Sequence, residues 1–210
     1  KGLGNNTVLS LMEDRDGNIW LALDNGVSLL DLHSPYRFYY DKEGVLGSIY
    51  AAASKDGFLY LGTNQGLFYK RIANTEPFRL IEGTRGQVWS LEAIGKNLFC
   101  NHHLGTFEVN RDQAKKIDGT RGSWLTRPVP SDSTLLMVGS YDGLYMLQSS
   151  GEGWKLRNHI AGFEHSSRFV EWFGGDVFVN LFFGASENSN SYYCQKDSNF
   201  AASSSSFAAA

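Results

Sequence analysis

The sequence predicts an all-β fold, a β-propeller built of four-stranded antiparallel blades, and two observations support this prediction. The first is a recurring phrase, which reads Asp-Gly-Asn-Ile-Trp-Leu-Ala at residues 16–22 and Asp-Gly-Phe-Leu-Tyr-Leu-Gly at 56–62 of the 210-residue chain. The second is its spacing, because marker glycines stand at positions 26, 66, 105, 143 and 184, in steps of 40, 39, 38 and 41 residues. A period near 40 residues, built of short apolar runs, is typical of propeller blades.

Each repeat contains the strands of one blade. In the first repeat the sequence predicts strands at residues 8–12, 18–23, 27–30 and 35–39. Asp-Asn-Gly at 24–26 supplies residues that tolerate positive φ in a tight hairpin. A proline introduces the fourth strand here and again at 77–81 in the second repeat. Proline suits an edge strand because it has no N–H to donate, so we expect the fourth strand to be outermost.

The period also divides the chain. We expect blades at approximately residues 1–44, 45–84, 85–119, 120–163 and, as a partial blade, 164–184. After Gly184 the pattern ends, and serine and alanine make up 14 of the 26 residues of 185–210. Such a composition buries little apolar surface, so we expect an irregular low-complexity tail there.

Two registers within the repeat predict the packing. Large residues at one register are expected to form the blade cores: Trp20, Tyr60, Phe99, Met137 and Phe178. Two positions later stand small residues, where neighbouring blades are expected to approach closely: Ala22, Gly62 and Gly139. Asn101 and Asn180 occupy that register in the remaining repeats, so the rule is loose.

Composition excludes several classes of protein. Hydrophobic residues make up 42% of the chain, which is ample for a packed core, and the net charge of −3 gives no electrostatic reason to expect nucleic acid as a partner. No apolar run is long enough to span a bilayer. The first residue is Lys1, and we expect the chain to be a segment of a longer protein. Cys100 holds a strand position that is apolar in other repeats, so a buried thiol is expected, while a disulfide with Cys194 stays open.

The repeat resembles a known family. The first repeat reads Gly-Asn-Asn-Thr-Val-Leu-Ser-Leu at 4–11, Glu-Asp at 13–14 and the recurring phrase at 16–22. It resembles the two-component regulator propeller repeat, whose pattern runs Asn-Asn-x-Val, Asp-x-x-Gly-x-Leu-Trp-Ile-Gly-Thr, x-x-Gly-Leu. Leu-Tyr-Leu-Gly-Thr-Asn-Gln-Gly-Leu at 59–67 matches the second half of that pattern. The resemblance covers about residues 1–184 and is strongest in the first two repeats.

The resemblance implies a function. Proteins with such repeats are periplasmic sensor portions of hybrid two-component regulators of Bacteroidetes, with seven-bladed propellers, a β-sandwich, a membrane helix and a kinase. It implies a periplasmic domain that senses glycan-derived oligosaccharides, works as a homodimer through its parent chain, contacts neighbouring propeller or β-sandwich domains, and catalyses no reaction. This chain shows about five repeats and none of the other parts, so the resemblance implies a fragment of the sensing domain.

A candidate ligand site lies in the loops that enter each innermost strand, at the mouth of a propeller channel. Gly-Thr-Arg-Gly occurs at 83–86 and again at 119–122, and Ser-Arg occurs at 167–168. The candidate site residues are Arg85, Trp89, Arg121, Trp124 and Arg168. Arginine offers a planar fork for carboxylate or sulfate and tryptophan can stack on a sugar ring, so an oligosaccharide, anionic or polyhydroxylated, is the expected ligand.

Other interpretations stay open. The Gly-Thr-Arg-Gly loops can instead be turn chemistry of the repeat, with the arginines paired to Glu82, Asp118 or Glu164. A glycan-active enzyme, either a hydrolase or a lyase, is disfavoured because no catalytic motif is present and adjacent strand residues His102 and His103 point to opposite faces. No cofactor or metal is expected. A protein-interaction scaffold using the aromatic fourth strands at 36–40 and 154–157 is the third possibility.

Overall fold

The computed structural model describes residues 3, 5–35, 41, 43–74, 76–173, 176–181, 191–194 and 208–209. Every regular element among them is a β-strand. Within these residues no helix has the length and apolar character needed to cross a membrane. The chain divides into two compact units, residues 1–45 and 46–210, which are described separately.

The first unit contains one antiparallel sheet of three described strands. Its strands, in the order β1-β2-β3, are β1 (Val8–Glu13), β2 (Ile19–Leu23) and β3 (Gly26–Leu30). They agree with the first three predicted strands to within one residue. The predicted fourth strand at 35–39 falls almost wholly on residues 36–40, which lie outside the described residues.

Asp14 fixes the hairpin between β1 and β2. Its carboxylate accepts hydrogen bonds from the backbone N–H groups of Asp16 and Asn18, both at 2.9 Å, and from the Trp20 indole Nε1–H at 2.8 Å. The Trp20 bond is the largest of the influences that lower the Asp14 pKa to about 2. The aspartate and tryptophan of the repeat pattern are therefore hydrogen-bond partners across this turn.

Trp20 corrects the predicted core stripe. Its side chain is 39% exposed, and its indole N–H reaches the Asp14 carboxylate. Phe178 is likewise 37% exposed and packs edge-on against Phe173 at a centroid distance of 6.2 Å. The prediction is right for the three middle positions, where Tyr60 is 2% exposed and Phe99 and Met137 are fully buried.

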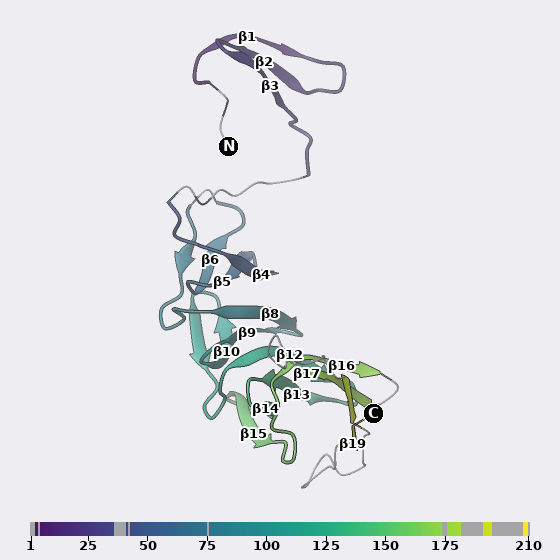
Figure 1. The fold of residues 1–210 in the computed structure, drawn as a ribbon. Coiled ribbons are helices and arrows are strands. Elements are labelled where there is room, and N and C mark those ends of the chain that lie inside the picture. The colour runs from purple at the N-terminus through teal and green to yellow at the C-terminus, as the bar shows by residue number, and fades with distance from the viewer. Residues whose placement is uncertain are drawn as a thin grey trace. The chain divides into compact units, whose positions relative to one another are not determined.

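The described residues of the second unit form four antiparallel sheets of four strands each, and Figure 1 shows how the sheets follow one another along the chain. In sequence order they are β4 (Ile49–Lys55), β5 (Phe58–Thr63), β6 (Leu67–Arg71) and β7 (Arg79–Leu80); β8 (Val88–Ile94), β9 (Asn97–His102), β10 (Gly105–Asn110) and β11 (Gln113–Lys116); β12 (Ser123–Val129), β13 (Asp132–Ser140), β14 (Gly143–Ser150) and β15 (Gly153–His159); and β16 (Ser167–Phe173), β17 (Asp176–Leu181), β18 (Ser191–Cys194) and β19 (Ala208–Ala209).

Two of these strands differ from the sequence expectation. The strand predicted at 77–81 is only the two residues of β7. In 185–210, where no strand was expected, β18 pairs with β17 and β19 pairs with β18. Pairing to an existing sheet edge needs only backbone groups, so the serine- and alanine-rich composition did not reveal these two short strands.

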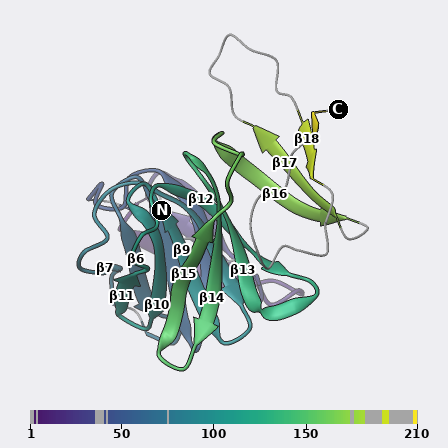
Figure 2. The ribbon, with the colours of Figure 1, turned by 90° about the horizontal axis from the view of Figure 1, so that it is seen from below.

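The sheets of the second unit are consecutive propeller blades. Innermost strands of neighbouring sheets contact one another in the order β4, β8, β12 and β16 (Figure 1). Figure 2 shows β16 and β17 beside the sheet that contains β12 and β13. The apolar core lies between sheets, since one buried cluster joins Tyr60 of β5 to Val88 and Leu98 of the next sheet. A second cluster joins Phe99 of β9 to Val138 of β13. Each blade is therefore stabilised by burying its faces against its neighbours.

The small-residue register is where neighbouring blades meet, as predicted. A Cβ added at Gly62 would lie 2.5 Å from the side chain of Val88, the first residue of the next innermost strand. A Cβ added at Gly139 would overlap the backbone carbonyl of Ser167, which belongs to the following blade. Glycine is used here for lack of a side chain, since neither residue has positive φ.

Asn101 shows why a larger residue is tolerated at the same register. Its side chain is fully buried and donates from Nδ2 to Ser90 Oγ at 3.0 Å. Its Oδ1 accepts from Thr126 Oγ1 of the next blade at 2.8 Å and from Thr106 Oγ1 at 3.3 Å. The polar group is satisfied across the blade boundary, and a buried amide with its bonds made is stabilising.

Candidate ligand site

The same backbone irregularity occurs near the start of every innermost strand. In β4, Ile49 pairs with Thr63 and Ala51 with Gly62, so one residue between them has no partner. The irregularity recurs at the second residue of each first strand: Leu9, Tyr50, Trp89, Trp124 and Arg168. A β-bulge bends the strand and redirects the side chain of the extra residue. The repeat therefore presents one side chain from each blade at a constant position.

In the second unit these bulge residues form an aromatic row. Ring centroids lie 5.8 Å apart for Tyr50 and Trp89 and 4.7 Å apart for Trp89 and Trp124. Tyr141, in the hairpin between β13 and β14, extends the row at 4.7 Å from Trp124. The Arg168 guanidinium lies 5.4 Å from the Trp124 ring centroid, within cation–π range. Four successive blades contribute to this row.

Hydrogen bonds hold the two indoles in place. Trp124 Nε1 donates to Ser166 Oγ of the next blade at 2.9 Å, and Trp89 Nε1 donates to the Tyr141 hydroxyl. Burial raises the pKa of Tyr141, and this effect is larger than the opposing effect of the Trp89 hydrogen bond. The phenol therefore stays neutral. Because both rings are fixed before any ligand arrives, little rotamer entropy remains to be lost on binding.

A cavity of about 240 Å³ opens beside this row. Its lining comes from the four innermost strands: Tyr50, Trp89, Ser90, Glu92, Trp124, Leu125, Arg127, Arg168 and Phe169. The combination of flat aromatic faces with a few polar groups is typical of small-molecule sites.

Arg127 ties three innermost strands together next to the cavity. Its guanidinium lies 3.0 Å from a Glu92 carboxylate oxygen and 3.1 Å from one of Glu171. Burial is the largest influence on the Arg127 pKa and acts to lower it, but the two carboxylates outweigh it and the pKa is raised. Both carboxylates are thus engaged by a permanent cation.

The five residues of the predicted site do not all lie together. Trp89, Trp124 and Arg168 line one cavity, whereas Arg85 and Arg121 are exposed and do not line it. Arg121 pairs with Asp142, at 3.3 Å. Burial raises the Asp142 pKa, but hydrogen bonds from Ser140 and Tyr145, followed by the charge of Arg121, bring it below its usual value.

The threonines of the Gly-Thr-Arg-Gly loops have a structural role. Thr84 Oγ1 donates to the Ile81 carbonyl at 2.6 Å and accepts from the Leu67 N–H at 3.2 Å. Thr120 makes the equivalent bonds to the Ile117 carbonyl and the Thr106 N–H, at 2.6 and 3.1 Å. In both blades the loop is thereby joined to the third strand just after the marker glycine, which is why the phrase recurs.

The two adjacent histidines are held by the backbone. Their ring centroids are 4.3 Å apart, so the expectation that they point to opposite faces is wrong, because β9 ends at His102 and His103 lies in the turn that follows. His102 Nδ1 accepts from the Leu104 N–H at 3.1 Å and its Nε2 lies 3.2 Å from the Thr84 carbonyl. Burial, followed by the charge of His103, lowers the His102 pKa to about 4. His103 Nδ1 accepts from the Gln87 N–H. Among the described residues, no three metal-ligating side chains come together.

Sequence reasoning missed two members of the aromatic row. Tyr50 occupies the same repeat position as Trp89, so a full alignment of the innermost strands identifies it. Tyr141 lies two residues before the marker glycine at 143, where the other repeats have Asp24, Asn64, His103 and Phe182. No sequence pattern distinguishes Tyr141, because its place in the row depends on how adjacent blades pack.

Solved structures of low sequence identity have the same fold. One is the extracellular domain of the putative hybrid two-component system BT4673 from B. thetaiotaomicron, with a TM-score of 0.54 and 15% identity over 93% of this chain and 27% of that one. Another is PorZ, an essential surface component of the type-IX secretion system of Porphyromonas gingivalis, with a TM-score of 0.51 and 10% identity over 92% and 27%. A third is hydrazine synthase of Kuenenia stuttgartiensis, with a TM-score of 0.53 and 15% identity over 75% of this chain and 49% of that one.

These likenesses and the blade geometry define the class of protein: the chain is built of β-propeller blades and spans about a quarter (27%) of the length of the first two structures. Residues 2–25 match the family model of the two-component regulator propeller, and this segment contains the hairpin fixed by Asp14 and Trp20. The resemblance predicted from the sequence is confirmed there. No curated protein sequence matches the chain.

Proposed function

We propose that this chain is part of an extracytoplasmic, ligand-sensing β-propeller of a two-component regulator, which recognises a glycan-derived oligosaccharide. The match at residues 2–25 and the fold shared with an extracellular domain of a hybrid two-component system support the sensor role and the location. Its partners in this proposal are the oligosaccharide, neighbouring propeller or β-sandwich domains of a parent chain, and a second copy of that parent.

The aromatic row is the observation that carries the proposal. Trp89 and Trp124 present fixed rings 4.7 Å apart at equivalent bulges, and sugar rings bind proteins by stacking their C–H faces on such aromatic surfaces. Arg168, over the Trp124 ring, supplies a planar donor for hydroxyl or carboxylate oxygens. Arg85 and Arg121 extend this proposed surface along the loops that enter the innermost strands.

Binding without chemistry is part of the proposal. Glu92 is the carboxylate that lines the cavity, and it is ion-paired to Arg127, as is Glu171. Both carboxylates thus hold the Arg127 guanidinium and join three innermost strands, which is a structural role. This arrangement suits a binding site rather than a hydrolase or lyase.

Signalling follows from where the site lies. The cavity is lined by β4, β8, β12 and β16, so one ligand contacts side chains from four blades. A ligand that prefers one spacing of those strands favours the conformation with that spacing. We propose that this shift in population, passed to adjoining domains, is the signal.

The test is a binding measurement with oligosaccharides released from plant and host glycans, followed by calorimetry and tryptophan fluorescence. We expect Trp124→Ala to weaken binding of the active oligosaccharide at least tenfold and Trp124→Phe, which keeps an aromatic face, to weaken it less. Phe173→Ala is the matched control, since Phe173 is an exposed aromatic residue, 76% exposed, that does not line the cavity.

Three outcomes distinguish the candidate functions. Saturable binding that depends on Trp124 and leaves the oligosaccharide intact supports the sensor. Release of shorter sugars by the unaltered chain, and not by a Glu92→Gln variant, would establish an enzyme instead. Equal affinity of the unaltered chain and the Trp124→Ala variant would remove the aromatic row as the site.

A further inference from the structure

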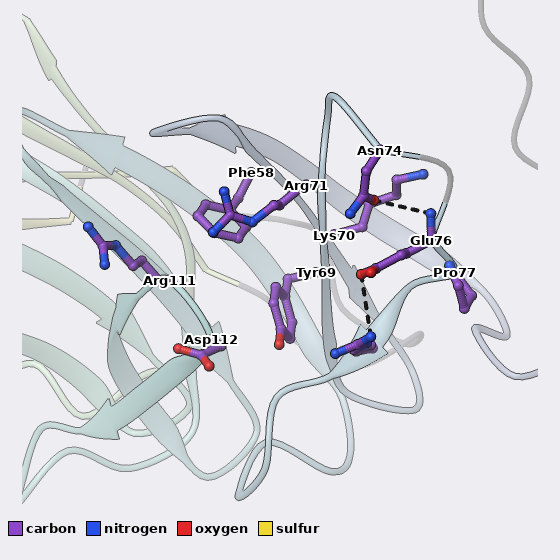
Figure 3. Close-up of a pocket in the computed structure, with 10 residues that line it drawn as sticks. Phe58, Tyr69, Lys70, Arg71, Asn74, Glu76, Pro77, Arg111 and Asp112 are labelled. Atoms are coloured by element: carbon purple, nitrogen blue, oxygen red, sulfur yellow. Dashed lines mark hydrogen bonds and ion pairs between the residues drawn. The ribbon is translucent and has the colours of Figure 1, made fainter.

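A second cavity, of about 310 Å³, lies between the outer strands of two neighbouring blades (Figure 3). One wall is formed by the end of β6 and the segment that leads to β7, and the other by the hairpin between β10 and β11. None of its lining residues belongs to the aromatic row or to the innermost strands. It is therefore a separate site from the one on which the proposed function rests.

The cavity is cationic in a chain that is acidic as a whole. The chain carries a net charge of −3, whereas four cations and two carboxylates line this space, a balance of +2: Lys70, Arg71, Arg79 and Arg111 against Glu76 and Asp112. Glu76 is already paired with Arg79 at 3.4 Å. Asp112, the second carboxylate of the lining, lies next to Arg111 on the β10–β11 hairpin.

Two arginines from different blades face this space (Figure 3). The Arg71 guanidinium lies 5.1 Å from the centroid of the Phe58 ring, a cation–π contact that holds it against the wall. Arg111 stands at the hairpin tip with a φ of +55°, a left-handed conformation uncommon for residues other than glycine. Among the described residues, neither arginine forms an ion pair.

We propose that this cavity binds an oxyanion, a carboxylate or a sulfate, carried on a single sugar-sized ring. Arg71 and Arg111 offer planar N–H forks that match both groups. Phe58 and Tyr69 supply aromatic walls for the ring, and a volume of about 310 Å³ is at the lower end of the range for small-molecule sites. A neutral sugar lacks the charge that the two arginines complement.

The test uses the full chain and three probes: methyl β-D-glucuronide, sodium sulfate and the neutral methyl β-D-glucoside, at constant ionic strength. Nuclear magnetic resonance of the arginine side-chain Nε–Hε groups reports on the cavity directly. We expect saturable shifts of the Arg71 and Arg111 signals with the glucuronide, with sulfate or with both, and none with the glucoside. The Arg111→Gln variant is expected to bind the anion at least fivefold more weakly.

Two further variants separate a site from general charge effects. Lys96→Gln removes the same unit of charge from a hairpin that does not line the cavity. The affinity of this variant for the anion is expected to equal that of the unaltered chain. Asp112→Asn removes the carboxylate that competes with the anion for the arginines, so this variant is expected to bind the anion more tightly. A variant that failed to fold would bind more weakly, so tighter binding cannot result from loss of folding. Linear shifts without saturation, equal weakening by Lys96→Gln, or weaker binding by Asp112→Asn would each overturn the proposal.

Discussion

Replacing Asn101 by alanine tests how neighbouring blades are joined. The Asn101 amide makes three side-chain hydrogen bonds in a fully buried position, one of them to Thr126 of the next blade. A buried hydrogen bond contributes about 1 kcal/mol net, and a partner left unsatisfied costs more. We therefore expect Asn101→Ala to lower the free energy of unfolding by about 3 kcal/mol, a large part of the 5–15 kcal/mol that is usual for a domain.

Urea denaturation measures this change. With a slope of about 2 kcal/mol per molar urea, a loss of about 3 kcal/mol lowers the unfolding midpoint by about 1.5 M. Asn158→Ala is the matched control, because Asn158 is exposed and makes one bond of 3.3 Å, and its effect should stay within about 0.5 kcal/mol. A loss below about 1 kcal/mol for Asn101→Ala would refute the reasoning.

A double-mutant cycle with Thr126→Val isolates the bond that crosses the blade boundary. The Thr126 hydroxyl donates to Asn101 Oδ1 at 2.8 Å, so the two substitutions should be coupled by about 1 kcal/mol. Purely additive effects would show that the two residues do not interact, and that the blades are not packed in this register.

Three other predictions concern single positions. Trp20→Phe removes the main donor to Asp14, so the Asp14 pKa should rise from about 2 toward 3.8 in a carboxyl NMR titration. The stabilising effect of Asp14 is present above its unfolded-state pKa and is lost as pH falls through the folded-state pKa. An Asp14 pKa that Trp20→Phe leaves unchanged would refute the hydrogen bond. Gly139→Ala should destabilise by about 2 kcal/mol or more, whereas Gly151→Ala, with open space around it, should not, as thermal unfolding can show. Burial raises the pKa of the Cys100 thiol, so thiol reagents should modify it only on unfolding. Rapid labelling of Cys100 in the native chain, distinguished from Cys194 by peptide mass, would contradict this.

The sequence predicted the fold well because the repeat records local requirements. A hairpin needs its glycine and a blade boundary needs its small residue, so the marker glycines and Gly62 and Gly139 were informative. The prediction that Trp20 is a buried core residue was wrong, because its indole N–H donates a hydrogen bond to Asp14 across the turn. Sequence cannot tell a buried aromatic from one that makes a hydrogen bond at a half-exposed position.

The site was only partly predictable for a related reason. Trp89, Trp124 and Arg168 share a repeat position, and the bulge common to the innermost strands turns that shared position into proximity. Arg121 was grouped with them from a loop motif, but it pairs with Asp142 across its own blade. Tyr141 joins the row through packing between blades, which no single repeat encodes.

The most direct test of the proposed function is a titration of the labelled chain with its oligosaccharide, followed through the indole Nε1–H signals. Binding at the aromatic row predicts saturable shifts of the Trp89 and Trp124 indole signals with a single affinity, accompanied by the side-chain signal of Arg168. The indole of Trp154, on the outer strand β15, should not move. Saturable shifts confined to Trp154, or to residues outside the row, would contradict the account.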